Sequence, residues 1–194
     1  MVFNNPRNNQ RIGQKSNQES GGQIQKRRPR RKNVSEYKKL LQEKQSLKRL
    51  YGLSEKQCKR YVKETLMMKN VGNLTDELIK RLERRIDSVV FRLGFAKSLP
   101  QARQLVTHAY FLVNGKSINI PSFQVKKGDI ISLKEGKKQK AIIKDVMETL
   151  KKMSIPSWLE MDKEKLQGKI LQYPTLAEVN PPIEISLVFE YYSR

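Results

Sequence analysis

The chain has 194 residues, 40 of them Lys or Arg and 19 of them Asp or Glu, so its formal net charge at pH 7 is +21. A charge of this size repels itself and indicates a polyanionic partner such as a nucleic acid. The single cysteine excludes a disulfide framework or a cysteine-rich zinc site, and because no apolar run approaches the roughly 20 residues of a membrane span we expect a soluble, intracellular protein with no membrane partner.

Residues 1–33 are polar and rich in Asn, Gln and Arg. Their few aliphatic and aromatic side chains cannot bury enough surface to offset the entropy of ordering, so we expect a disordered basic N-terminal arm. The arm ends in KRRPRRK, from Lys26 to Lys32. In isolation this run could be a nuclear import signal, but beside further basic segments we interpret it as an electrostatic arm that folds onto nucleic acid.

Residues 34–84 show three helical patterns and predict a small all-helical domain. Gly52 ends the first pattern, and Ser54 and Gln57 have capping-box spacing at the start of the second. Gly72-Asn73 ends the second, and Thr75 is expected to cap the third. The apolar stripes are Tyr37, Leu40, Leu41 and Leu47, then Tyr61, Val62 and Leu66, and last Leu78, Ile79 and Leu82. Cys58 lies in the second pattern, where we expect an ordinary buried or half-buried thiol.

Two short amphipathic helices are predicted between residues 85 and 109. The first ends at Gly94, and Ser98 with Gln101 has capping-box spacing for the second. The stripes that would be buried are Ile86, Val89, Val90 and Leu93 in the first helix, and Ala102, Leu105, Val106 and Ala109 in the second.

A β-hairpin is predicted next, because Asn114-Gly115 stands between alternating apolar residues and a type I′ turn needs two positive φ angles. Phe123–Val125 and Ile130–Leu133 are expected to be short strands, Ala141–Lys152 a helix and Ile185–Phe189 a strand-like stretch. Residues 151–194 hold six basic and six acidic side chains, so the whole net charge lies in the first 150 residues and the rest is expected to be scaffold.

The run RRIDSVVFRLGFAKSLPQARQLVTHAYFLVNGKSINIPSFQVKKGDII closely resembles the RNA-binding domain of small-subunit ribosomal protein four, the S-four family. LLQEKQSLKRLYGLSEKQCKRYVKE resembles the family's first helical domain, IPSWLEMDKEKLQGKI its late segment and FEYYSR its C-terminus. The resemblance implies an α+β fold: a basic arm (1–33), a helical domain (34–84, joined by 178–194) and an RNA-binding domain (85–177, module core 85–148) of two helices packed on a small, mostly antiparallel sheet.

The resemblance also implies a function. Such a protein would be a structural constituent of the small ribosomal subunit that binds ribosomal RNA at a multi-helix junction of the 5′ region, nucleates assembly and helps line the mRNA entry channel. Its partners would be this RNA, neighbouring small-subunit proteins and mRNA, in the cytoplasmic ribosome of a bacterium or in the ribosome of an organelle such as a plastid. Some relatives hold a metal on N-terminal cysteines that this chain lacks, so we expect no metal and no cofactor.

The expected RNA contacts are cations and polar side chains that the apolar stripes leave on the opposite side, together with the basic end of the arm. They are Arg27, Arg28, Arg30, Arg31, Lys32, Lys44, Lys48, Arg49, Lys59, Arg60, Arg85, Lys97, Ser98, Arg103, Gln104, His108, Asn114 and Lys116. Asn114 is needed for the turn in any case, and His108 fits either an RNA contact or a helix C-terminus. Tyr37, Tyr51 and Tyr61 are interpreted as half-buried packing residues rather than stacking platforms.

Two alternatives have sequence support. RRIDS resembles the Arg-Leu-Asp motif of pseudouridine synthases, but the large catalytic domain of those enzymes has no counterpart here, and Asp87 suits the N-terminal dipole of a helix. We therefore expect no enzyme. A stand-alone RNA chaperone or stalled-ribosome factor could use the same module, but it would lack the helical domain and the late WLE and FEYYSR segments.

Overall fold

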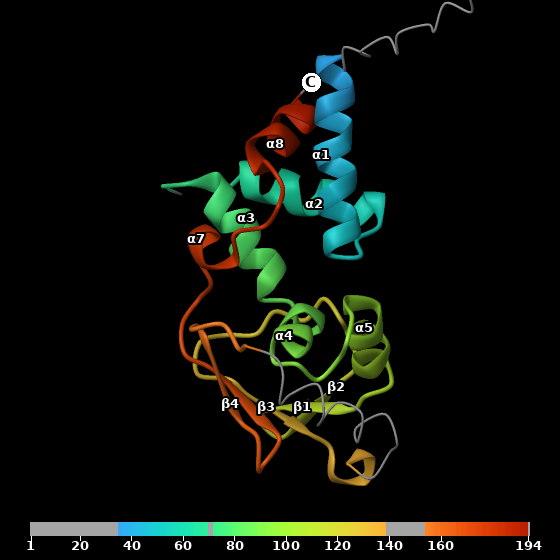
Figure 1. Ribbon diagram of the computed structural model, residues 1–194, viewed down its shortest axis with the longest axis vertical. Coiled ribbons are helices and arrows are strands. Elements are labelled where there is room, and N and C mark those ends of the chain that lie inside the picture. Colours follow the sequence, from blue (N-terminus) through green and yellow to red (C-terminus); the bar gives the residue numbers. More distant parts are fainter. Residues whose placement is uncertain (1–34, 70–71, 139–153, 194) are drawn as a thin grey trace, which may run out of the picture. The chain divides into compact units, whose positions relative to one another are not determined.

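A computed structural model describes residues 35–69, 72–138 and 154–193 (Figure 1). The expected N-terminal arm and the expected helix Ala141–Lys152 lie outside the described residues. The described part contains two hydrophobic cores, one among helices and one between helices and a sheet. None of the described helices is long and apolar enough to cross a membrane.

The helical core lies among α1 (Glu36–Leu50), α2 (Glu55–Leu66), α3 (Leu74–Glu83), the short α7 (Leu176–Val179) and α8 (Ile185–Ser193). Helix α8 packs along α1, far from it in the sequence (Figure 1). The buried side chains are Leu47, Tyr51, Leu53, Cys58, Tyr61, Val62, Leu78, Ile79, Leu82, Ile185, Val188 and Phe189. The expected burial of the thiol is confirmed, and so is the Ser54–Gln57 capping box, with both of its hydrogen bonds present.

Four expectations about this core are wrong. Ile185–Phe189 is helix rather than strand, because Ile185, Val188 and Phe189 are spaced to bury one helical face in the core. Asn73 rather than Thr75 caps α3: its side-chain oxygen accepts a hydrogen bond from the Thr75 amide at 3.0 Å. Tyr37 is 55% exposed, since it lies in the first turn of α1, away from the core. Leu66, expected in the apolar stripe of the second helix, is 39% exposed because it is the last residue of α2.

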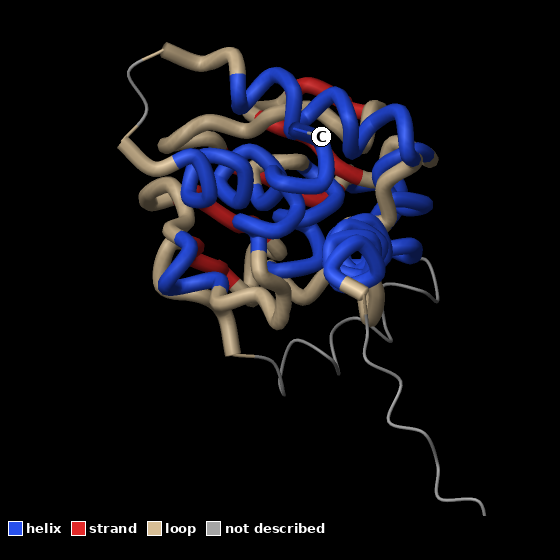
Figure 2. The backbone as a smooth tube through the Cα atoms, turned by 90° about the horizontal axis from the view of Figure 1, so that it is seen from above, coloured by secondary structure: helices blue, strands red, loops and turns tan. Residues whose placement is uncertain are grey.

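The sheet core lies between two helices, α4 (Ile86–Arg92) and α5 (Leu99–Thr107), and a five-stranded sheet (Figure 1). Seen from above, the strands, in red, lie behind the blue helices (Figure 2). The strands are β1 (Phe111–Val113), β2 (Lys116–Ile118), β3 (Ile130–Leu133), β4 (Leu159–Asp162) and β5 (Gln167–Ile170). Their order is β2-β1-β3-β5-β4, and every neighbouring pair is antiparallel. The expected α+β class is thereby confirmed.

The two helices follow their predicted stripes with two differences. Ile86, Val89, Val90 and Leu93 are fully buried, and Gly94 ends α4 with φ +82°. In α5 the Ser98 hydroxyl accepts from the Gln101 amide at 3.4 Å, but the Gln101 side chain accepts from the amide of Lys97 instead of that of Ser98. Ala109 lies beyond α5 with φ +52°, so the buried stripe stops at Val106.

The hairpin of β1 and β2 is confirmed, with φ +50° at Asn114 and +79° at Gly115 as a type I′ turn requires. Strand β3 is also confirmed. Phe123–Val125 is not a regular strand. Gln124 forms an isolated β-bridge with Arg85, and the Ile86 amide donates a hydrogen bond to the Phe123 carbonyl at 2.9 Å. The segment therefore anchors the start of α4.

Candidate nucleic-acid interface

The predicted contacts in the arm, Arg27, Arg28, Arg30, Arg31 and Lys32, lie outside the described residues. The remaining predicted contacts fall into two groups. Some are exposed on α2, α5 and the hairpin, whereas others are bound inside the molecule by carboxylates.

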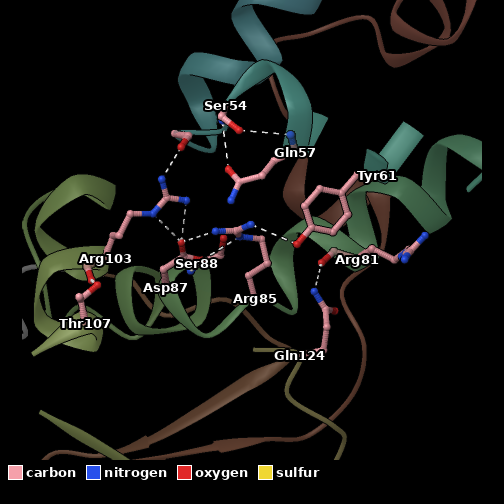
Figure 3. Close-up of polar contacts among 11 residues, drawn as sticks. Ser54, Gln57, Tyr61, Arg81, Arg85, Asp87, Ser88, Arg103, Thr107 and Gln124 are labelled. Atoms are coloured by element: carbon pink, nitrogen blue, oxygen red, sulfur yellow. Dashed lines mark hydrogen bonds and ion pairs between the residues drawn. The ribbon is translucent and has the colours of Figure 1, made fainter. Parts of the chain in front are cut away.

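Arg85 was expected on the exposed face, and that expectation is wrong, because its side chain is fully buried. Its guanidinium donates from Nε to Asp87 Oδ1 at 2.9 Å and from a terminal nitrogen to Asp87 Oδ2 at 2.5 Å (Figure 3). The other terminal nitrogen donates to the Tyr61 hydroxyl at 3.1 Å. Asp87 is itself fully buried, so its charge needs this cation.

Arg103 is also bound internally rather than freely exposed, since only 32% of its side chain is accessible. Nε and one terminal nitrogen donate to Asp87 Oδ2 at 3.2 and 3.1 Å, and the other terminal nitrogen donates to the Gly52 carbonyl at 2.5 Å. Figure 3 shows the guanidinium reaching from α5 between the Asp87 carboxylate and the chain just before Ser54.

Lys44 was expected to contact RNA and is instead buried between α1, α2 and α8. Its ammonium donates to Glu55 at 3.1 Å and to the Tyr191 hydroxyl at 3.3 Å, and it lies 4.4 Å from the centre of the Tyr191 ring. Burial alone would lower the pKa of Lys44, but the hydrogen bonds to Glu55 and Tyr191 outweigh burial and raise it. Lys48 binds the other oxygen of Glu55 at 2.6 Å, and this bond above all lowers the Glu55 pKa to about 2.

Asn114 also has a structural role in the hairpin. Its amide nitrogen donates to Asp129 at 2.9 Å, and its amide oxygen accepts from the Ile130 amide at 3.0 Å. Both polar groups of the side chain are therefore used to hold the turn against the start of β3. The neighbouring Lys116 is exposed.

An exposed cationic stripe runs along α2. Lys56, Lys59, Arg60 and Lys63 follow the spacing i, i+3, i+4, i+7, so they share one helical face. We call these four residues the α2 stripe. Within the described residues, Lys56, Lys59 and Lys63 form no ion pair, and Arg60 has a loose one with Glu64 at 3.8 Å. Sequence reasoning selected Lys59 and Arg60 but missed Lys56 and Lys63, although their spacing was visible.

The α2 stripe borders an open depression of about 610 Å³. Ser54 and Gln57 lie at one end of α2, and Ser122 contributes from the loop before β3. That loop is fixed to α4, because the Asp87 amide donates to the Pro121 carbonyl at 3.3 Å and the Ile86 amide donates to the Phe123 carbonyl. The depression thus combines cations with hydroxyl and amide groups from α2, its N-cap and the loop before β3, which suits an anionic, hydrogen-bonding ligand.

A second polar surface lies on α5 and the hairpin. Gln104 and His108 are exposed on α5, and His108 is the C-terminal cap whose amide donates to the Gln104 carbonyl. Lys97 and Ser98 are exposed just before α5, where the Ser98 hydroxyl is used as the helix cap, and Lys116 is exposed on β2. Arg49 is exposed at the end of α1. Within the described residues, no three His, Cys, Asp or Glu side chains are grouped to hold a metal ion.

Comparison with known proteins places the chain in a family. Residues 2–83 match the family described as the ribosomal protein S4/S9 N-terminal domain, and residues 84–131 match the S4 domain. The first match also covers most of the N-terminal arm.

Full-length relatives agree with both matches. Small ribosomal subunit protein uS4 of Persephonella marina is 47% identical over 165 residues, which cover 84% of this chain and 80% of that protein. The uS4 protein of Syntrophobacter fumaroxidans is 47% identical over 84% of this chain and 78% of its own length, and that of Thermotoga petrophila is 43% identical over 85% and 78%. These relatives are ribosomal proteins and not enzymes. The expected resemblance is confirmed, and the chain belongs to the uS4 family of small-ribosomal-subunit proteins.

Proposed function

We propose that the chain is a structural constituent of the small ribosomal subunit that binds ribosomal RNA at a multi-helix junction of the 5′ region and nucleates assembly there. The α2 stripe is the observation that carries this proposal. Carboxylates bind Arg85, Arg103 and Lys44 internally, whereas the stripe leaves its charges at an open depression.

The mechanism is electrostatic and geometric. Cations on the α2 stripe displace the counterions of phosphates, and this release gives affinity without reading sequence. Gln57, Ser54 and Ser122 offer hydrogen bonds beside the cations, at positions suited to phosphate and 2′-hydroxyl oxygens. The surface of α5 and the hairpin supplies a second contact. A-form RNA hides its base edges in a deep groove, so recognition is mainly of backbone and shape.

The other expected roles belong to the same proposal. Residues 1–33 act as a basic arm whose Arg28, Arg30 and Arg31 face mRNA at the entry channel. Residues 34–84 with 178–194 form the helical domain, and 85–177 form the RNA-binding domain. The packing of α8 on α1 supports the helical grouping. Neighbouring small-subunit proteins are partners, and the ribosome is that of a bacterium or an organelle.

The test is a salt titration with RNA of the small-subunit 5′ region. Replacing Lys56, Lys59 and Lys63 with Gln should weaken binding and reduce the slope of log affinity against log salt by roughly 0.7–0.9 for each phosphate that the variant no longer neutralises. The matched control replaces Lys163, Lys165 and Lys169, three exposed lysines at the β4–β5 hairpin, with Gln.

The control removes the same formal charge and should leave affinity and slope nearly unchanged. Equal losses in both triple variants would show attraction by net charge alone and reject the α2 stripe as an interface. A stand-alone chaperone would instead leave small subunits during a high-salt wash, whereas the proposed constituent stays bound.

A further inference from the structure

Several polar links join the helical core to the sheet core, among them three that use Arg92, Arg85 and Arg103. Tyr51, in the turn after α1, donates to Glu83 at 2.8 Å, and Arg92 of α4 binds both oxygens of the same carboxylate at 2.6 and 3.0 Å. Tyr61 of α2 accepts from Arg85 at 3.1 Å. The third link is Arg103, which connects α5 to the Gly52 carbonyl.

The Arg103 link holds the start of the helix that carries the α2 stripe. Gly52 lies two residues before Ser54, the N-cap of α2. The Leu53 amide donates to the Lys48 carbonyl at 2.9 Å, so this short turn is already closed onto α1. A bond that fixes the Gly52 carbonyl therefore fixes the origin of α2 with respect to α5.

The chemistry of the link is specific to a guanidinium. Arg103 uses three nitrogens, two toward Asp87 and one toward Gly52, in a planar fork (Figure 3). Asp87 is fully buried and is shared with the fully buried Arg85, so its position is held from two sides. A lysine at 103 could keep the charge but would contact one of these partners at a time.

We propose that Arg103 is a positioning residue for RNA binding. It does not contact phosphate but fixes the α2 stripe relative to the surface of α5 and the hairpin, so that both engage one RNA junction. This inference rests on the proposed function and identifies the residue that sets the relative position of the two RNA-binding surfaces.

The experiment compares Arg103→Met and Arg103→Lys with the unchanged chain by two independent measurements. The first is the distance distribution between spin labels at Gln42→Cys on α1 and Glu164→Cys in the β4–β5 turn, both exposed positions, while Cys58 is buried and unlabelled. The second is RNA affinity across salt concentrations. Circular dichroism verifies the helical content of each variant.

Both variants should broaden the label distribution and weaken RNA binding by about tenfold, with an unchanged salt slope, because the number of phosphates neutralised stays the same. Normal affinity in Arg103→Lys, together with a reduced salt slope in Arg103→Met and unchanged label distances, would show that Arg103 binds phosphate and overturn the inference. If Arg103→Met fails to fold, Arg103→Lys decides alone: a broadened distribution supports positioning, and an unchanged one rejects it. The label distances need no RNA, so they stay informative if the α2 stripe proposal fails.

Discussion

Leu93, the C-cap of α4, lies directly against Gly168 in β5. A Cβ atom built on Gly168 would stand 2.6 Å from Cδ2 of Leu93 and closer still to Cδ1, whereas real Cβ atoms essentially never approach within 3.0 Å. Leu93 is fully buried and cannot turn away into solvent. The close packing of α4 on the sheet thus depends on a strand residue without a side chain.

Gly168→Ala should therefore destabilise the fold by about 1–3 kcal/mol through overpacking. Urea denaturation measures this change. The paired variant Gly168→Ala with Leu93→Ala should cost less than the sum of the two single changes, because the smaller side chain at 93 makes room for the new methyl group. Strict additivity would mean that the two residues do not compete for the same space.

Arg85→Ala should destabilise the protein by about 3–5 kcal/mol, because it leaves the buried Asp87 carboxylate with Arg103 alone as a cationic partner. Lys116→Ala is the control for removal of a positive charge and should stay within about 0.5 kcal/mol of the unchanged chain, since Lys116 is exposed. Thermal and urea unfolding check both values. Similar, small effects would show that Arg85 is not buried as described.

Glu55 should make stability depend on pH in the acid range. The pKa of Glu55 is lowered from 4.5 to about 2, mainly by the hydrogen bond that Lys48 donates to its carboxylate. The ionised form of Glu55 is therefore favoured in the folded state. Its contribution is fully present above about pH 4.5 and is lost as the pH falls through about 2. Because Glu55 is about half exposed, solvent screening limits this contribution to about 1 kcal/mol. Melting temperatures of Glu55→Gln and the unchanged chain should differ at pH 5 and converge near pH 2. A constant difference would contradict the assignment.

Asn114→Ala should cost about 1–2 kcal/mol, since it removes two side-chain hydrogen bonds at a residue with φ +50°. Asn114→Gly is the matched variant, because glycine accepts the backbone angle but not the hydrogen bonds, and it should recover part of the loss. Chemical denaturation separates the two contributions. RNA affinity of the folded variants should be unchanged, whereas a selective decrease in affinity would restore the expected RNA contact.

Local patterns in the sequence predicted the local structure well. The stripe from Ile86 to Leu93 became a buried helical face, the Ser54–Gln57 box formed both of its bonds, and Asn114-Gly115 made the hairpin. Each signal depends on residues within one or two turns of chain. The run Ile185–Phe189 is too short for periodicity to separate strand from helix, and packing against α1 decided in favour of helix.

Local patterns could not predict which cationic side chains are exposed and which are bound by partners inside the protein. Arg103 binds a carboxylate 16 residues away and a carbonyl 51 residues away, and Lys44 meets Tyr191 across 147 residues. Counting charges on helix faces treats such residues as exposed, because these partners come together only in the folded chain. The α2 stripe shows the opposite case, in which helical spacing alone would have identified four exposed cations on one face.

The packing of α8 on α1 has a consequence for synthesis. Helices α1, α2 and α3 are synthesised well before Ile185, Val188 and Phe189, which belong to the same core. The sheet core needs nothing later in the chain than Ile170. During translation, α1, α2 and α3 therefore keep part of their apolar surface exposed until α8 has been synthesised. The sheet core can form before that point.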